Sequence, residues 1–261
     1  MKYTEPELME RAAAAVAAAS ELLSGGAIHE IRSKSPTDFV TDVDFAVQER
    51  LKRELAELAP EVQFMGEEQD NSAIDPARPF WVLDPVDGTT NLIRGLDRSA
   101  VSLALCLGDG ALFGVVRNPF RRETFTARLG GGAYMNGEPI RVSATSPLAK
   151  AVFNAGTAPG RRDMSTAVFR ELGALYEHCV DLRRSGCASL DLCDVACGRL
   201  DGYLERWLLP WDYAAGMLIV SEAGGKATDC SGAKLPLTQG SPLLATNGII
   251  HAETLKLLSE V

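Results

Sequence analysis

The feature that most constrains the fold is a short apolar run that stops at two carboxylates. Residues 80–83 are Phe-Trp-Val-Leu, and Asp84 and Asp87 follow, separated by Pro85 and Val86. A continuous apolar run of this length, bounded by polar residues, indicates a buried strand. Asp84 therefore stands where a strand ends, and the turn fixed by Pro85 allows Asp87 to converge on the same point.

The residues after this turn are suited to holding an anion beside a cation. Paired carboxylates supply the oxygen ligands that hard divalent cations such as magnesium prefer. Gly88 lets the backbone approach a ligand closely, and Thr89 and Thr90 add hydroxyls and amides that can cradle an anion. The pattern predicts a metal site that binds phosphate. An Asp-rich surface turn is the alternative for this segment taken alone.

More acidic residues stand at the ends of other predicted elements. Glu67 and Glu68 follow the apolar run 62–65, Asp44 lies in the first turn of a predicted helix, and Asp212 opens another helix. Acids that open helices are often only caps, so Asp44 and Asp212 each have a purely structural explanation. Several acids at element ends nevertheless favour one shared site.

The hydrophobic periodicity changes along the chain. A Thr4-x-x-Glu7 capping box and a Gly25-Gly26 stop bound the first predicted helix. We expect helices near residues 12–23, 41–59, 164–178, 189–196, 212–223 and from 252 onward. We expect strands near residues 62–65, 80–83, 100–107, 111–116, 124–129, 151–154, 180–182, 202–205, 226–228 and 243–245.

These patterns predict two packed halves. Hairpin signals between residues 100 and 137 indicate an antiparallel sheet, whereas strands and helices alternate after residue 146. We therefore predict an α+β subdomain over residues 1–145, which holds most metal ligands, and an α/β subdomain over residues 146–261 that completes the site.

Charge and composition exclude several classes of function. The formal net charge is −9 and basic residues form no cluster longer than an Arg pair, so nucleic acid is not an expected partner. The N-terminal segment lacks a signal-peptide pattern and no stretch is long enough to span a bilayer, so we expect a cytoplasmic protein without a membrane partner. The six cysteines show no CxxC spacing, which argues against a zinc or disulfide framework.

Three segments resemble one known family. Residues 84–91, Asp-Pro-Val-Asp-Gly-Thr-Thr-Asn, resemble the signature of the inositol monophosphatases. Residues 66–68, Gly-Glu-Glu, resemble the segment that precedes it, and residues 211–216, Trp-Asp-Tyr-Ala-Ala-Gly, resemble the C-terminal signature. Further similarity is found, in the order that the family requires, at Lys34 and residues 40–44, 184–188 and 198–205.

The resemblance implies both an activity and a fold. It implies a magnesium-dependent phosphomonoesterase that hydrolyses inositol monophosphate to inositol and phosphate with a metal-activated water. The implied fold is a mixed α+β and α/β one, the layered αβαβα sandwich of the sugar phosphatases. By the same resemblance, we expect two or three Mg²⁺ ions, a homodimer and inhibition by lithium.

The family pattern also assigns metal ligands. It implies that Glu67, Asp84 and the Val86 carbonyl hold the first metal, and that Asp84, Asp87 and Asp212 hold the second. Glu67 would help to hold a weaker third. Two metals can lower the pKa of water, orient it and neutralise the departing alkoxide.

The remaining roles come from the same comparison. Thr89 and Glu67 would position and activate the attacking water, with Asp44 hydrogen-bonded to Thr89. The amides of Gly88 and Thr89 would bind the phosphate. The alcohol part of the substrate, a small phosphorylated polyol or sugar, would face Asp87, Ala188, Glu205 and Asp212.

The chain departs from the family pattern in two places. Arg94-Gly95 and Asp97-Arg98 stand where many members have His-Gly and Pro, and Cys187 stands where Ser or Thr is usual. These departures bear on the substrate and on subunit contacts, and leave the metal ligands unchanged.

The resemblance leaves other functions open. Relatives cleave fructose 1,6-bisphosphate, histidinol phosphate or nucleotide 3'-phosphates, although Thr90-Asn91 favours an inositol phosphate over the nucleotides. A non-catalytic regulator that binds transcription machinery is the alternative of a different class.

Overall fold

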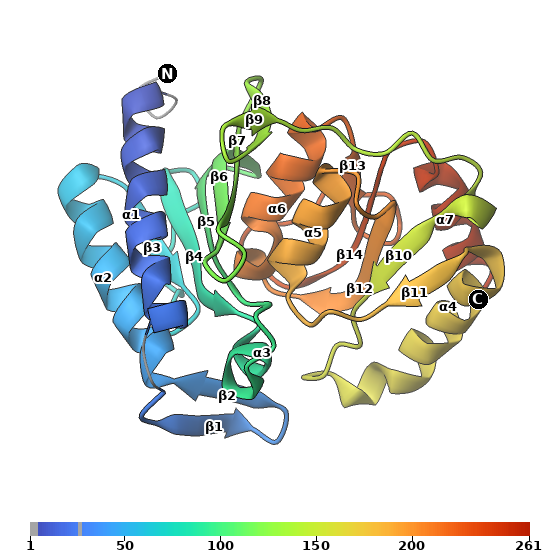
Figure 1. Ribbon diagram of the computed structural model, residues 1–261, viewed down its shortest axis with the longest axis horizontal. Helices are drawn as coiled ribbons and strands as arrows, with labels where there is room; N and C mark the ends of the chain where they lie inside the picture. The colour runs from blue at the N-terminus through green and yellow to red at the C-terminus, as the bar shows by residue number, and fades with distance from the viewer. Residues whose placement is uncertain (1–4, 26–27) are drawn as a thin grey trace.

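The computed structural model describes residues 5–25 and 28–261, which form alternating layers of helices and sheets (Figure 1). One outer layer comprises α1 (Pro6–Gly25) and α2 (Asp42–Leu58), and the middle helical layer comprises α5 (Ala188–Ala196) and α6 (Pro210–Glu222). The other outer layer comprises α4 (Ser165–His178) and α7 (His251–Ser259). A sheet lies in each of the two spaces between these layers. The predicted αβαβα sandwich is therefore confirmed.

The first sheet has seven strands in the order β3-β4-β5-β6-β7-β8-β9. Its strands β3 and β4 are parallel and every later pair is antiparallel. The antiparallel prediction for residues 100–137 is thus confirmed. The strands are β3 (Gln63–Gly66), β4 (Phe80–Asp87), β5 (Ala100–Leu107), β6 (Gly110–Asn118), β7 (Glu123–Arg128), β8 (Gly132–Met135) and β9 (Glu138–Pro139).

The second sheet has five strands in the order β11-β10-β12-β14-β13. Strand β10 is parallel to β11 and β12, whereas β14 is antiparallel to β12 and β13. The strands are β10 (Val152–Ala155), β11 (Asp181–Arg183), β12 (Gly202–Leu208), β13 (Lys226–Thr228) and β14 (Ser241–Thr246). The two sheets use separate stretches of chain, and the division into subdomains at residue 145 stays a prediction.

Three hydrophobic clusters fill the spaces between layers. One lies between α1, α2 and the first sheet and includes Val16, Leu51 and Leu103. The largest surrounds α5 and α6 and contacts both sheets, and the third packs α4 and α7 against the second sheet. Helices α5 and α6 are thus covered on two sides, which explains their apolar sequences.

Some elements were not evident from sequence. The hairpin of β1 (Ile31–Ser35) and β2 (Asp38–Thr41) was missed because β1 is mostly exposed and lacks apolar alternation. The short helix α3 (Thr89–Arg94) begins without a side-chain cap. Thr4 and Gly26, which belong to the predicted bounds of the first helix, lie outside the described residues.

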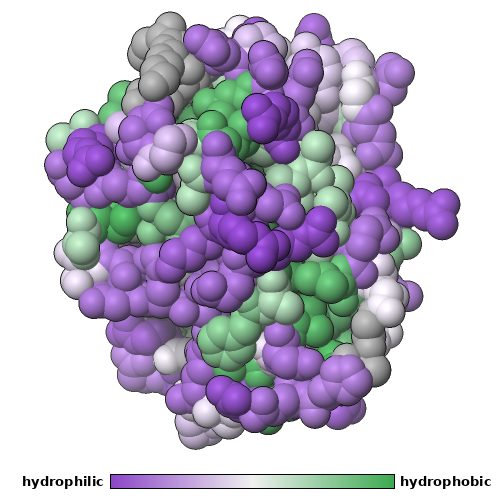
Figure 2. Space-filling view, turned by 90° about the vertical axis from the view of Figure 1, so that its left-hand side faces the viewer, coloured by the Kyte–Doolittle hydropathy of each residue, from purple (hydrophilic) through white to green (hydrophobic). Residues whose placement is uncertain are grey.

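The face built by α1 and α2 is largely hydrophilic, with smaller apolar patches (Figure 2). Within residues 5–25 and 28–261, no helix combines the length and apolarity needed to cross a bilayer.

Candidate active site

The end of β4 carries two buried carboxylates at a break in strand pairing. Asp84 pairs with Ser102 and Asp87 with Ala100, so β4 has one residue more than β5 between these pairs. Residues three apart on a regular strand face opposite sides, but this bulge restores the phase and turns both carboxylates to one face. Pro85 is tolerated there because a bulge needs no ladder N–H. The predicted convergence of Asp84 and Asp87 is thus explained by a bulge.

The carboxylate of Asp87 lies at the N-terminus of α5. Its Oδ1 accepts from the Ala188 amide at 3.2 Å and its Oδ2 from the Ser189 amide at 2.6 Å. The first amides of a helix have no intrahelical partner and favour a negative charge. Burial raises the pKa of Asp87, while the Ser189, Cys187 and Ala188 donors lower it. Strand β4 and helix α5 are joined through this carboxylate.

Asp212 lies in the first turn of α6, where Pro210 stands within the first two helical positions. Its Oδ2 accepts from the Leu209 amide at 2.6 Å, so the structural role of a cap is present. Burial, followed by the charges of Asp87 and Glu67, raises the pKa of Asp212 well above its ordinary value. Asp212 therefore both caps α6 and interacts electrostatically with Asp87 and Glu67.

Glu67 follows β3 and faces a lysine from the β1–β2 hairpin. Its amide donates to the Leu83 carbonyl at 3.2 Å, which ties it to the strand that leads to Asp84. Lys34 Nζ lies 3.0 Å from Glu67 Oε1 and also contacts Glu68. Burial raises the pKa of Glu67 to about 7, although the charge of Lys34 lowers it.

Thr89 lies between Asp44 and the backbone of β4. Its Oγ1 is 2.9 Å from the Val86 carbonyl oxygen and 3.3 Å from Asp44 Oδ1. The other oxygen of Asp44, Oδ2, accepts from the Thr41 amide at 2.8 Å and so caps α2. Burial is the main cause that raises the pKa of Asp44 to about 6. Asp44 thus serves as a helix cap and contacts Thr89, as the family pattern implies.

Gly88 and Glu205 border the same region. Gly88 has φ +86°, which favours glycine, and its carbonyl accepts from Ser99 Oγ at 2.8 Å. Glu205 on β12 accepts from the Ala158 amide at 2.9 Å and from the Tyr203 hydroxyl at 2.5 Å. Its pKa is raised mainly by burial, and the charge of Asp87 adds to this. The predicted substrate residues therefore share one electrostatic environment with the predicted metal ligands.

The charge pattern tests whether these residues suit a metal. Burial and then the charges of four other acids raise the pKa of Asp84 well above its ordinary value; these acids are Glu67, Asp87, Asp212 and Asp44. Buried carboxylates that repel one another are stabilised by a cation, and hard divalent ions take oxygen ligands. The donor set therefore fits such an ion. In the part of the chain that the structure describes, no group of three or more Asp, Glu, His or Cys side chains lies close enough together to form a preformed metal site.

Comparisons with known proteins decide the family. The model of the inositol monophosphatase family matches residues 4–261. The chain belongs to the inositol monophosphatase family. It is 42% identical over 246 residues to an inositol-1-monophosphatase of Synechocystis, covering 92% of this chain and 84% of that protein. It is 41% identical over 212 residues to a Nus factor SuhB of Xylella fastidiosa, covering 80% and 75%.

Solved structures agree with this assignment. An inositol monophosphatase from Anabaena superposes with a TM-score of 0.88 at 33% identity, covering 98% of this chain and 96% of that one. A suhB protein from Bartonella henselae gives 0.89 at 32% identity, covering 97% and 99%. This inositol monophosphatase family member is a phosphatase, and the family is generally metal-dependent.

Several residues that hold the site together were not identified from sequence. Ser189 donates to Asp87 but lies just outside the family-like segment 184–188. Tyr203 donates to Glu205 and lies within the family-like segment 198–205, but the resemblance assigned it no role. Asp191 and Asp194 lie in an otherwise largely apolar buried helix, three residues apart. Charged residues at helical spacing within an apolar run were the signal that could have found this second pair.

Proposed function

We propose that this phosphatase is magnesium-dependent and hydrolyses inositol monophosphate to inositol and phosphate. The observation that carries the proposal is the buried acidic set around Asp84. After burial, the charges of neighbouring carboxylates raise the pKa of Asp84 and of Asp212 well above their ordinary values. Lys34, bonded to Glu67, compensates only part of this charge. Divalent cations with oxygen ligands would compensate the rest.

The metal ligands would be those that the family pattern implies. Glu67, Asp84 and the Val86 carbonyl would hold one Mg²⁺, and Asp84, Asp87 and Asp212 a second. Glu67 would contribute to a weaker third. When bound, these ions would lower the pKa of water and neutralise charge on the departing alkoxide.

The chain's own groups would orient water and substrate. The Thr89 hydroxyl, fixed by the Val86 carbonyl and Asp44, would orient the attacking water, and Glu67 would accept its proton. The amides of Gly88 and Thr89 would bind the phosphate at the start of α3.

The alcohol part would meet hydrogen-bond acceptors. Asp87, Glu205 and Asp212, with the backbone at Ala188, would face the hydroxyls of a polyol. The similarity to proteins named inositol-1-monophosphatase at 42% and 38% identity supports an inositol phosphate over fructose 1,6-bisphosphate, histidinol phosphate or another sugar phosphate.

Phosphate release from a panel of substrates tests this proposal. The panel contains inositol 1-phosphate, fructose 1,6-bisphosphate, histidinol phosphate and a nucleotide 3'-phosphate, each with and without Mg²⁺. We expect Mg²⁺-dependent turnover that is fastest with inositol 1-phosphate and inhibited by Li⁺. Turnover of only another phosphate would overturn the substrate, and turnover without a divalent ion would overturn the metal.

A substitution separates catalysis from a binding role. Asp84→Asn keeps the shape of the side chain but removes a charge shared by two proposed metals, so phosphate release should fall by about 1,000-fold or more. Asp109→Asn, in the exposed turn between β5 and β6, is the matched control. Unchanged activity of the Asp84 variant would contradict the proposed site.

A second candidate is a regulator that binds a protein partner without catalysis. Relatives named Nus factor SuhB, 36–41% identical to this chain, favour it. Two results together would support this second function: the wild type releases no phosphate from any substrate of the panel, and the Asp84→Asn variant still binds the partner.

We further propose a cytoplasmic homodimer, whose mass in solution is measurable by light scattering.

A further inference from the structure

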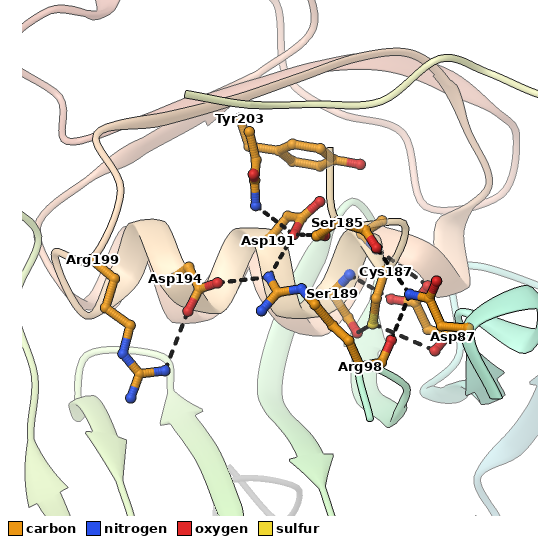
Figure 3. A network of polar contacts seen from close by, with 12 residues as sticks. Asp87, Arg98, Ser185, Cys187, Ser189, Asp191, Asp194, Arg199 and Tyr203 are labelled. Carbon is orange, nitrogen blue, oxygen red and sulfur yellow. Dashed lines mark hydrogen bonds and ion pairs between the residues drawn. The ribbon is translucent and has the colours of Figure 1, made fainter. Parts of the chain in front are cut away.

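Arg98 bridges two carboxylates of the buried helix α5. Its Nη2 lies 2.7 Å from Asp191 Oδ1 and 2.6 Å from Asp194 Oδ2, and 17% of its side chain is exposed (Figure 3). Arg98 belongs to the segment between α3 and β5, in which the chain departs from the family pattern. The contact therefore joins a loop of the first sheet to the helical layer between the sheets.

Asp191 is the centre of a wider network. Besides Arg98, its Oδ1 accepts from Asn154 Nδ2 at 2.6 Å and contacts Ser185 Oγ. Asn154 lies on β10 and Ser185 precedes α5, so Asp191 fixes the start of this helix from two sides. Arg98 supplies the positive charge that this 2% exposed carboxylate needs.

The backbone around Arg98 holds the predicted phosphate loop. Its carbonyl oxygen accepts from Asn91 Nδ2 at 2.8 Å, and the next residue, Ser99, donates to the Gly88 carbonyl at 2.8 Å. A Cβ at Gly88 would lie 3.0 Å from the Arg98 carbonyl oxygen. The loop that contains Gly88 therefore packs directly on the backbone that the Arg98 side chain anchors.

Helix α5 completes the connection at Asp87. The Ala188 and Ser189 amides, three and two residues before Asp191, donate to the two oxygens of this carboxylate. A shift of α5 relative to β4 would lengthen these bonds and turn the carboxylate. Arg98 therefore contacts both supports of the site. Its side chain binds α5, whose amides hold Asp87, and its own loop packs against Gly88.

We propose that Arg98 is a positioning residue, which fixes α5 against the 88–99 segment so that Asp87 keeps the orientation needed to bind metal. The proposal rests on the proposed function only in taking Asp87 as a metal ligand. Partners that orient a ligand typically change metal affinity by about 10- to 100-fold when they are removed. We expect the lower part of that range, since Arg98 acts through α5.

The test compares Arg98→Met with Arg199→Met. Arg199 is a matched control because it contacts the same Asp194, at 3.3 Å, but its other side-chain partners are Glu123 on β7 and the sulfur of Met135 on β8. Mg²⁺ binding is measured by calorimetry on metal-free protein, together with phosphate release and thermal melting. We expect Arg98→Met to weaken Mg²⁺ binding about 10-fold and to lower kcat more than it raises KM, whereas Arg199→Met matches wild type in both.

Arg98→Lys covers the case in which Arg98→Met does not fold. Lysine keeps the charge, but its side chain is shorter than that of arginine, so its ammonium should reach the position of Arg98 Nη2, which contacts both carboxylates, less well. The Mg²⁺ affinity of Arg98→Lys should therefore lie between those of wild type and Arg98→Met, or about 3-fold below wild type. Wild-type Mg²⁺ affinity in the folded Arg98 variants would overturn the positioning role and leave the proposed function intact. A wild type that binds no Mg²⁺ would instead overturn the proposed function.

Discussion

The carboxylate of Glu205 occupies the space in which a side chain at Gly156 would lie. Gly156→Ala must therefore displace Glu205 from the Tyr203 hydroxyl and the Ala158 amide. We expect kcat/KM for inositol 1-phosphate to fall about 10-fold or more, with Mg²⁺ affinity unchanged, because Glu205 is proposed to face the alcohol and not the metal. Gly160→Ala, in the same loop and with open space at its Cβ, is the control.

Thr89 should be catalytic through its hydroxyl alone. Thr89→Val keeps the branched shape but removes the group that lies between Asp44 and the Val86 carbonyl. Steady-state kinetics should show a loss in kcat of about 100-fold or more, with recovery in Thr89→Ser. The neighbouring Thr90 is exposed, and Thr90→Val keeps the backbone amide that could cradle an anion, so this variant should retain activity. Equal losses in both Val variants would point to a damaged loop and contradict the role of the hydroxyl.

The layered fold followed from periodicity and from the family resemblance, but the geometry of β4 did not. The apolar run predicted a strand that ends at Leu83, whereas β4 continues through Pro85 to Asp87. A proline within a polar segment ordinarily marks a turn, and only the pairing of β4 with β5 shows that a bulge accommodates it. Strand pairing depends on a partner distant in sequence, so local pattern could not reveal it.

Residues of the candidate site that stand in a sequence motif could be predicted, whereas the contacts that distant elements make with them could not. Asp84 and Asp87 stand in one recognisable segment, but the amide donors of Asp87 come from α5, about a hundred residues later. Asp44 caps α2 with one oxygen and contacts Thr89 with the other, so its structural role is observed and its functional role stays a prediction. A single sequence cannot separate such roles when one carboxylate performs both.

Removal of one acid from the cluster should change stability in opposite directions with and without metal. In metal-free protein, Asp84→Asn removes a buried carboxyl whose pKa is raised by burial and by Glu67 and Asp87, so the free energy of unfolding of the variant should exceed that of wild type. Mg²⁺ at 100 times its Kd should stabilise wild type by about 2.7 kcal/mol and the variant far less. Chemical denaturation with EDTA or Mg²⁺ measures both. A metal-free variant less stable than wild type would contradict the repulsion.

His251 should make the protein sensitive to mild acid. The residue is 1% exposed, and its ring lies between two hydroxyls. That of Thr228 is 2.9 Å from Nε2 and that of Thr246 is 3.0 Å from Nδ1. Burial, aided by the charge of Lys226, lowers the pKa of His251 to about 4. The unfolded chain, whose histidine pKa is about 6.5, therefore binds the proton more readily than the folded one.

The sign of the effect on stability follows from this difference. The contribution of neutral His251 is fully present above pH 6.5 and is lost as the pH falls toward 4, by about 2 kcal/mol between pH 6.5 and 5. The acidic cluster pulls in the opposite direction, because its raised pKa values favour the folded state in acid. The free energy of unfolding of wild type and of His251→Gln is therefore measured by urea denaturation at pH 7.5 and at pH 5, and the two changes are compared. Between these pH values the free energy of unfolding of wild type should fall by about 2 kcal/mol more than that of His251→Gln. His178→Gln, at an exposed histidine, should behave like wild type.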